Sequence, residues 1–322
     1  MLRVRGISYL VGGSPGVIRR DLEAIARDLR CTAVMLICAD VEALAEAARS
    51  ALEVGLDVWI RPDFTEVRRR EVLERLEIVA VAAEELRREH PGRVTLLVGS
   101  EFSHTVPGIV PAPRSFLRLK LIIDHRRLLR RRIDRGVYRL LFDTARVARR
   151  HFRGPLGYSA AAWENPDWSL FDVVGVALYR SGRNRADYAG RLRKLVRDND
   201  KPVVITEFGC GAFTGADDMG AASYRIVKWF SATPHVRDGH PRDETVQARH
   251  LAELIDLYDD EGVHGCFVFT FAMPDFPHRE DRRLDLDRAG FGVVACAEDG
   301  TRRPKRAFGE VARLYGGMAR RP

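Results

Sequence analysis

The sequence has few cysteines and no arrangement of metal-binding residues. Its five cysteines lie far apart, without a CxxC pair or a Cys/His cluster of zinc-site spacing. The nine histidines form no HxH or HExxH pattern, and the GxSxG motif of serine hydrolases is missing. We therefore expect reduced, buried cysteines in a cytoplasmic protein that uses no metal or other cofactor.

Long apolar runs are also absent. No run reaches the roughly 18 residues that span a bilayer. The N-terminal residues lack the apolar core of a signal peptide. We therefore expect no membrane association, and an extracellular polysaccharide is not the expected target.

Outside a single segment, the sequence has almost no excess of positive over negative charge. Residues 114–135 contain nine basic and two acidic side chains, whereas the rest of the chain has 44 basic and 43 acidic ones. The net charge of +8 therefore comes almost entirely from this segment. A uniformly basic surface is excluded, which argues against nucleic acid as the partner.

The sequence does contain a regular alternation of short apolar runs and longer amphipathic stretches. Runs that are apolar throughout are typical of parallel strands covered on both faces. Eight strand–helix units predict one (β/α)8 barrel domain over residues 1–322. An open doubly wound sheet is the alternative, but no GxGxxG turn follows the first run. The expected strands are Val4–Tyr9, Thr32–Ile37, Leu56–Ile60, Val94–Val98, Pro155–Ser159, Phe171–Leu178, Pro202–Thr206 and His264–Phe271.

The alternation breaks after the fourth strand. We expect a basic insertion over residues 104–137, and the next barrel helix over Tyr138–Phe152. Near-helical spacing of Leu128, Leu129 and Ile133 predicts an amphipathic helix with arginines on its other faces. Three interpretations remain open: a solvated helix paired with acids elsewhere, a helix that binds an anionic surface or nucleic acid, or a lid that favours acidic substrates.

Two glutamates stand at the ends of predicted strands. Glu101 follows the fourth strand and Glu207 follows the seventh. In a barrel, active groups lie at the carboxyl ends of the strands, so both would share one mouth. Two carboxyl groups suit glycoside hydrolysis, because one protonates the leaving oxygen while the other attacks the sugar or activates water. The structural alternative is that each glutamate caps a helix or pairs with an arginine.

The motif Thr206-Glu207-Phe208-Gly209 resembles the nucleophile strand of the clan A (4/7) glycoside hydrolases. The chain is also similar to actinobacterial proteins often labelled abortive infection proteins, from Gly6-Ile7-Ser8-Tyr9 to Gly292-Val293-Val294. The resemblance implies a (β/α)8 fold, Glu101 as acid/base, Glu207 as nucleophile and a retaining mechanism. One departure is Ser100, because clan A enzymes usually have asparagine there, bonded to the sugar 2-hydroxyl.

Other candidate site residues follow the remaining strands. The resemblance implies that Tyr179 hydrogen-bonds the nucleophile. Arg61 could bind an anionic group or hold Glu101 ionised, and Trp163 could stack on a sugar face. The full set of expected substrate-binding residues is Tyr9, Arg61, Ser100, Trp163, Glu164, Tyr179, Asp275 and His278.

These observations favour a glycosidase that acts on a small soluble glycoside, of neutral or anionic type. A catalytically silent barrel that binds a carbohydrate or a glycosylated metabolite, in phage defence, is a second hypothesis. A biosynthetic enzyme that uses the same carboxylates for proton transfer is a third. The sequence leaves the sugar, its linkage and the oligomeric state open.

Overall fold

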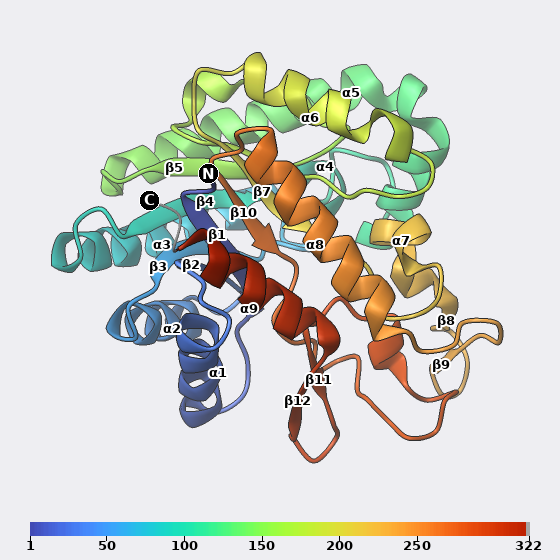
Figure 1. Cartoon of the computed structure of the whole chain (residues 1–322). Coiled ribbons are helices and arrows are strands. Elements are labelled where there is room, and N and C mark those ends of the chain that lie inside the picture. Colours follow the sequence, from blue (N-terminus) through green and yellow to red (C-terminus); the bar gives the residue numbers. More distant parts are fainter. Residues whose placement is uncertain (320–322) are drawn as a thin grey trace.

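Eight parallel strands close into a barrel in the computed structural model, which describes residues 1–319 (Figure 1). Going round the barrel, the strand order is β1-β10-β7-β6-β5-β4-β3-β2. All eight lie where the apolar runs predict them, so the predicted (β/α)8 barrel is confirmed. The barrel strands are β1 (Val4–Leu10), β2 (Ala33–Cys38), β3 (Asp57–Pro62), β4 (Val94–Ser100), β5 (Leu156–Ala161), β6 (Val174–Ala177), β7 (Val203–Phe208) and β10 (Gly265–Val268).

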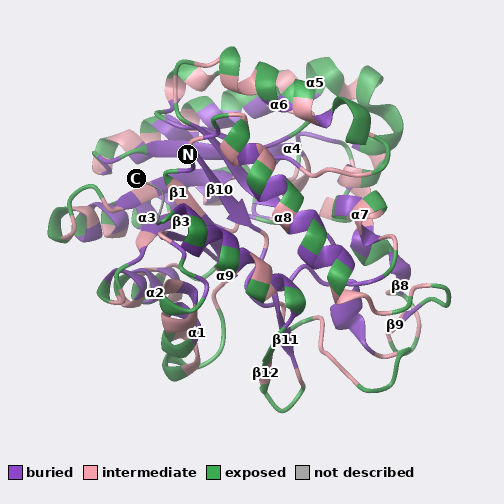
Figure 2. Cartoon of the chain, in the orientation of Figure 1, coloured by how far each residue is buried: buried purple, intermediate pink, exposed green. Residues whose placement is uncertain are grey.

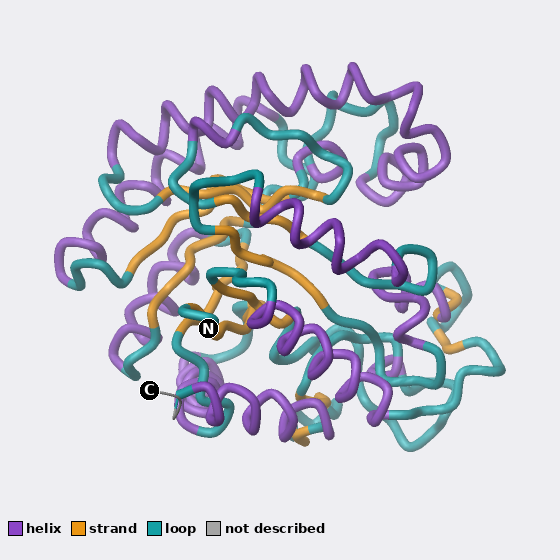
Figure 3. The backbone as a smooth tube through the Cα atoms, turned by 45° about the horizontal axis from the view of Figure 1, so that its top comes forward, coloured by secondary structure: helices purple, strands orange, loops and turns teal. Residues whose placement is uncertain are grey.

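Helices surround the strands on the outside (Figure 3). Two of them begin at aspartates that cap free backbone amides: Asp40 accepts a bond from the Ala43 amide, and Asp243 accepts one from the Thr245 amide. The long helices are α1 (Pro15–Arg27), α2 (Val41–Glu53), α3 (Arg69–Glu89), α5 (Ser115–His151), α6 (Arg185–Arg197), α8 (Glu244–Asp260) and α9 (Arg306–Met318).

The short elements α7, β8 and β9 lie on one side of the barrel, beyond the end of α8 (Figure 1). The end to which the parallel strands point is the mouth at which active groups are expected. The short elements are α4 (Phe102–Thr105), α7 (Ala216–Met219), β8 (Val227–Lys228), β9 (His235–Val236), β11 (Val294–Cys296) and β12 (Arg302–Pro304), with 3-10 turns at Trp168–Leu170, Gly220–Ile226 and Leu286–Arg288.

The barrel interior is packed with side chains rather than open (Figure 2). Trp59 and Phe267 meet there with ring centroids 5.0 Å apart. Gly6 makes room for them, because a Cβ at this position would lie 2.3 Å from the Phe267 ring. A second, larger core fills the space between the strands and the helices. The lower barrel is therefore a solid floor beneath the mouth.

The helix predicted over Tyr138–Phe152 is present, but it begins much earlier in the chain than predicted. Helix α5 starts at Ser115 and runs to His151, with one non-helical residue at His125. Its buried positions Ile122, Ile133 and Val137 continue into the barrel-facing part of the helix. The predicted basic insertion 104–137 is therefore mostly a helical extension, whose narrow apolar stripe is hidden by the many arginines around it.

No helix within residues 1–319 combines the length and apolar character needed to cross a membrane. The five cysteines, all in this described part, are free thiols, and four of them are buried. Burial raises the pKa of Cys210, which lies three residues after Glu207, so this thiol stays protonated. Cys210 is therefore a packing residue rather than a nucleophile.

Candidate active site

Glu207 is held by two side chains at the mouth of the barrel. The Arg61 guanidinium, from β3, forms an ion pair with Glu207 Oε1, and the Tyr179 hydroxyl donates to Oε2 at 2.9 Å. Burial lowers the pKa of Arg61, but the charge and hydrogen bond of Glu207 raise it by more. Arg61 is thus a permanent positive partner, and both oxygens of Glu207 are fixed.

Tyr179 connects the two candidate carboxylates electrostatically. Its pKa is raised well above the ordinary value, first by burial, then by the charge of Glu207 and next by the charge of Glu101. The hydroxyl therefore stays protonated and donates to Glu207. The charges of both glutamates act on Arg61 as well.

Glu101 has a special backbone conformation directly after β4. Its φ of +47° is left-handed, which is uncommon for a residue with a side chain and costs about 1 kcal/mol. Its amide donates to the carbonyl of Ser159 on β5 at 2.9 Å, and the carbonyl of Glu101 starts α4. Such strain is retained mostly at functional positions. It turns the chain sharply from the barrel wall into α4.

His104 is a site residue that the sequence analysis missed. Its Nε2 lies 2.7 Å from Glu101 Oε2, and its Nδ1 lies 2.9 Å from Ser115 Oγ at the start of α5. Burial lowers the pKa of His104, but the hydrogen bond and charge of Glu101 raise it by more, to above its ordinary value. A sequence signal existed, because Glu101 and His104 have the i, i+3 spacing of neighbours on a helix.

Trp163 and Glu164 lie beside α4. The Trp163 indole donates to Ser103 Oγ at 3.0 Å, and its ring lies 6.2 Å from the His104 ring. Glu164 accepts bonds from the Ser103 amide at 2.8 Å and from the Tyr158 hydroxyl at 2.8 Å. Burial raises the pKa of Glu164, and these hydrogen bonds oppose it. Both residues support the segment that carries His104.

Ser100 is the last residue of β4 and is half-buried. Its carbonyl accepts a bond from the Thr105 hydroxyl at 3.0 Å, which closes the turn around Glu101. It pairs in register with Ser159, whose hydroxyl lies 2.7 Å from the Thr206 hydroxyl inside the barrel. Ser100 is therefore next to the mouth, where the resemblance places a sugar-binding side chain.

Tyr9 does not join this group. Its hydroxyl lies 3.0 Å from Asp21 Oδ2 on α1, and burial, followed by the charge of Asp21, raises its pKa. The reason is the alternation of side chains along a strand. Leu10 packs with the interior cluster, so Tyr9 faces the helix layer.

Asp275 and His278 also lie elsewhere. Asp275 is exposed in the loop after β10. His278 is bonded to Asp285 at 2.9 Å, in a network where Arg242 also bonds Asp285 at 3.1 Å and Asp287 at 2.8 Å. His278, Asp285 and Asp287 have metal-like spacing, but Arg242 pairs with both carboxylates and Lys305 pairs with Asp287 as well. This network holds the C-terminal loops together. Neither Asp275 nor His278 forms a hydrogen bond or an ion pair with Glu207.

The arginines of residues 114–135 divide into two groups. Arg118 is fully buried and donates to the carbonyls of His104 at 2.6 Å and Thr105 at 3.0 Å, and to Glu66 at 2.9 Å. The arginines from Arg126 to Arg135 are all exposed on α5. Within the described residues, none of these exposed arginines forms a hydrogen bond or an ion pair with Glu101 or Glu207, so their role as a lid stays a prediction. Of the arginines in residues 114–135, only Arg118 forms hydrogen bonds with α4.

The comparisons with known proteins relate this chain to glycosidases by fold. No family model and no curated protein matches it. A GH113 β-1,4-mannanase is similar over 98% of this chain and 99% of its own, with TM-score 0.64 and 13% identity. The GH113 β-mannanase from Alicyclobacillus acidocaldarius, solved with ManMIm, has TM-score 0.63 and 14% identity over 99% and 98% of the two chains. A β-glucuronidase from Ruminococcus gnavus has TM-score 0.59 and 16% identity, over 98% of this chain and 50% of its own.

This chain therefore has a glycoside hydrolase-like barrel. The identities, 13–16% among these neighbours, show a shared fold and leave the reaction open. Nothing in the comparisons supports the similarity to actinobacterial proteins labelled abortive infection proteins.

Proposed function

We propose that this protein is a retaining glycosidase, with Glu207 as nucleophile and Glu101 as acid/base. The observation that carries the proposal is the different surroundings of the two carboxyl groups. Glu207 is bonded to a guanidinium and a phenol, which fix the orientation of its two oxygens. Glu101 is bonded to an imidazole, which exchanges protons near neutral pH. Two carboxyls with different environments suit the two roles in glycoside hydrolysis.

In this proposal, His104 supplies protons to Glu101. Oε2 of Glu101 and Nε2 of His104 lie 2.7 Å apart, which is hydrogen-bond distance, so the imidazole is placed to pass a proton to the carboxylate. In the first step of retention, Glu101 gives a proton to the leaving oxygen while Glu207 attacks the anomeric carbon. In the second step, Glu101 takes a proton from water as the glycosyl–Glu207 bond breaks.

Two exposed aromatic rings suit a sugar substrate. Phe116 is 55% exposed and Phe230 is 91% exposed, and their ring centroids lie 6.0 Å apart. Phe116 follows Ser115, the partner of His104, and Phe230 lies in the loops after β7, the strand of Glu207. Aromatic faces pack on the C–H faces of sugars. We propose a small, soluble glycoside as the substrate, met in the cytoplasm, with Ser100 and Trp163 near its reacting end.

The test uses aryl glycosides with two kinds of leaving group. Each is given to the wild-type chain and to the variants Glu207→Gln and Glu101→Gln. A panel of glucosides, mannosides and glucuronides identifies the sugar. With a poorly acidic phenol as leaving group, both variants should lose nearly all turnover. With dinitrophenol, which leaves without protonation, Glu101→Gln should keep its first step, whereas Glu207→Gln should stay inactive.

A control and a product measurement complete the test. Glu46→Gln removes the charge of an exposed glutamate on α2, far from the proposed pair in the sequence, and it should remain active. The first product should keep the anomeric configuration of the substrate when followed by NMR. Full activity of Glu207→Gln, or an inverted product, would overturn the proposed mechanism. A folded wild-type chain that cleaves none of the panel would favour a silent carbohydrate-binding barrel.

A further inference from the structure

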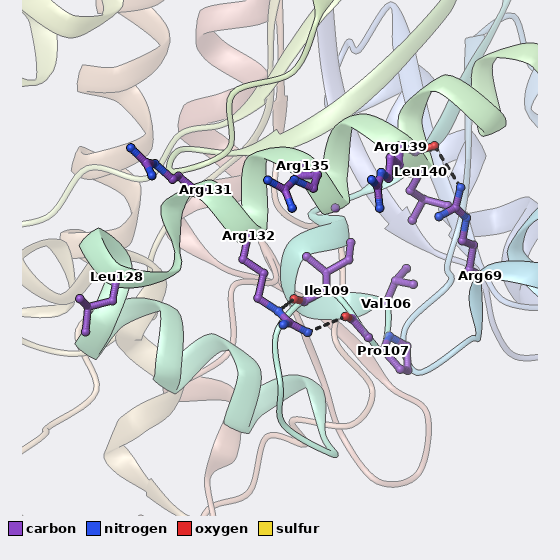
Figure 4. Close-up of a pocket in the computed structure, with 12 residues that line it drawn as sticks. Arg69, Val106, Pro107, Ile109, Leu128, Arg131, Arg132, Arg135, Arg139 and Leu140 are labelled. Carbon is purple, nitrogen blue, oxygen red and sulfur yellow. Dashed lines mark hydrogen bonds between the residues drawn. The ribbon is translucent and has the colours of Figure 1, made fainter.

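A cavity of about 610 Å³ lies between α5 and the loop that follows α4 (Figure 4). Neither Glu101 nor Glu207 lines it, so it is separate from the proposed active site. One wall is α5, and the opposite wall is formed by residues 106–109. The volume is in the range of small-molecule sites in proteins.

Five arginines line this cavity, and no acidic residue does. They are Arg69 from α3 and Arg131, Arg132, Arg135 and Arg139 from α5. We call this cavity the arginine pocket. Such a concentration of one charge makes the pocket strongly positive and favours an anion.

Three of these arginines have no partner of their own. Within residues 1–319, the side chains of Arg131, Arg135 and Arg139 take part in no ion pair or hydrogen bond. They recur every four residues, so they form a row along α5, above the loop that carries Pro107 and Ile109 (Figure 4). At 1.5 Å per residue the row is about 12 Å long.

The other two arginines are fixed parts of the pocket. Arg132 donates to the carbonyls of Ile109 at 2.5 Å and Gly108 at 3.2 Å, which ties the loop to the helix. Arg69 forms an ion pair with Asp143 and approaches the carbonyl of Arg139 at 3.5 Å. The pocket is thus preformed, with free guanidinium groups on a fixed frame.

Apolar side chains complete the lining. They are Val106, Pro107 and Ile109 on the loop and Leu128 and Leu140 on α5. The loop and the helix approach closely at Gly136, where a Cβ would lie 2.9 Å from Ile109. The pocket therefore offers a row of positive charge beside an apolar wall.

We propose that the arginine pocket binds a small molecule that carries two or more phosphate groups. Guanidinium groups bind phosphate oxygens in pairs, and the spacing of about 6 Å between successive arginines in the row suits separate phosphates. The apolar wall would contact an uncharged part of the same molecule. A pocket of this size fits a small molecule, whereas a nucleic acid duplex would need a longer charged surface.

Isothermal titration calorimetry with inorganic tripolyphosphate tests this proposal. The variant is Arg131→Gln/Arg135→Gln/Arg139→Gln. Its matched control is Arg126→Gln/Arg127→Gln/Arg150→Gln, which removes three exposed arginines of α5 that do not line the pocket. Tripolyphosphate should bind the wild-type chain with submillimolar affinity. The pocket variant should lose at least about tenfold in affinity, and the control less than about threefold.

The outcomes separate the alternatives. Equal losses in both variants would show general charge attraction and would overturn the pocket. A preference for a DNA duplex, with affinity rising with its length, would assign the arginines to nucleic acid instead. The absence of tripolyphosphate binding by the wild-type chain would also overturn the proposal. Circular dichroism checks that both variants remain folded, and none of these measurements depends on glycosidase activity.

Discussion

The ion pair between Arg61 and Glu207 allows a quantitative test of the site. Both side chains are only 11% exposed. Removing one partner of a buried pair leaves the other charge uncompensated, so Arg61→Gln should lower the free energy of unfolding by about 3 kcal/mol. Glu207→Gln should cost about 2 kcal/mol, because the charges of Asp63 and Glu101 also act on Arg61.

The double variant decides whether the two side chains act as a pair. With both charges replaced by amides, the expected cost is again about 2 kcal/mol, which gives a coupling energy of about 3 kcal/mol. Urea unfolding, followed by the fluorescence of the four tryptophans, measures each value. The exposed pair Arg19–Glu53 is the control, with an expected coupling much smaller than that of the buried pair. A coupling for Arg61 and Glu207 as small as in the control would refute the reasoning.

Three further variants probe other contacts. Tyr179→Phe removes a hydrogen bond to a charged acceptor and should lower kcat about tenfold to a hundredfold on the aryl glycoside that the panel identifies; an unchanged kcat would contradict its role. The raised pKa of His104 means that its stabilising effect is complete below its ordinary value of 6.5 and is lost as the pH rises through the raised value. Urea unfolding should therefore show a larger penalty for His104→Gln at pH 6 than at pH 9, and an equal penalty at both would exclude the charged pair with Glu101. Arg242→Met removes the cation shared by Asp285 and Asp287, which keep their contacts with His278 and Lys305, and should cost about 3 kcal/mol in the same assay, against a much smaller cost for the exposed Arg19→Met.

The fold was predictable because its signals are local and repeated. Each buried strand is an apolar run, and turn and cap residues such as Asp40 and Asp243 mark where helices begin. The positions of Glu101 and Glu207 follow from this pattern, because a strand end in a barrel is a known place in space. Arg61 and Tyr179 follow strands three and six, and the structure brings both to Glu207.

Contacts that depend on side-chain direction were not predictable in the same way. Tyr9 was predicted near the mouth because it is close to the end of β1. Side chains alternate along a strand, however, and its ring points to α1. His278 is in a long loop after β10, and its partner Asp285 is set by the path of that loop. The amphipathic helix predicted from Leu128, Leu129 and Ile133 is present, but its continuity with the helix over Tyr138–Phe152 was missed, because arginines occupy most of the surface between them.

Helix α4 lies between the proposed active site and the arginine pocket. It carries His104 on the side of Glu101, and the chain continues from it directly into the loop wall at residues 106–109. Arg118 holds α4 in place by donating hydrogen bonds to the carbonyls of His104 and Thr105. If an anion in the pocket shifts α4, thermodynamic linkage requires that substrate change the anion's affinity by the same factor. Comparing anion binding with and without a bound sugar would measure that coupling free energy directly.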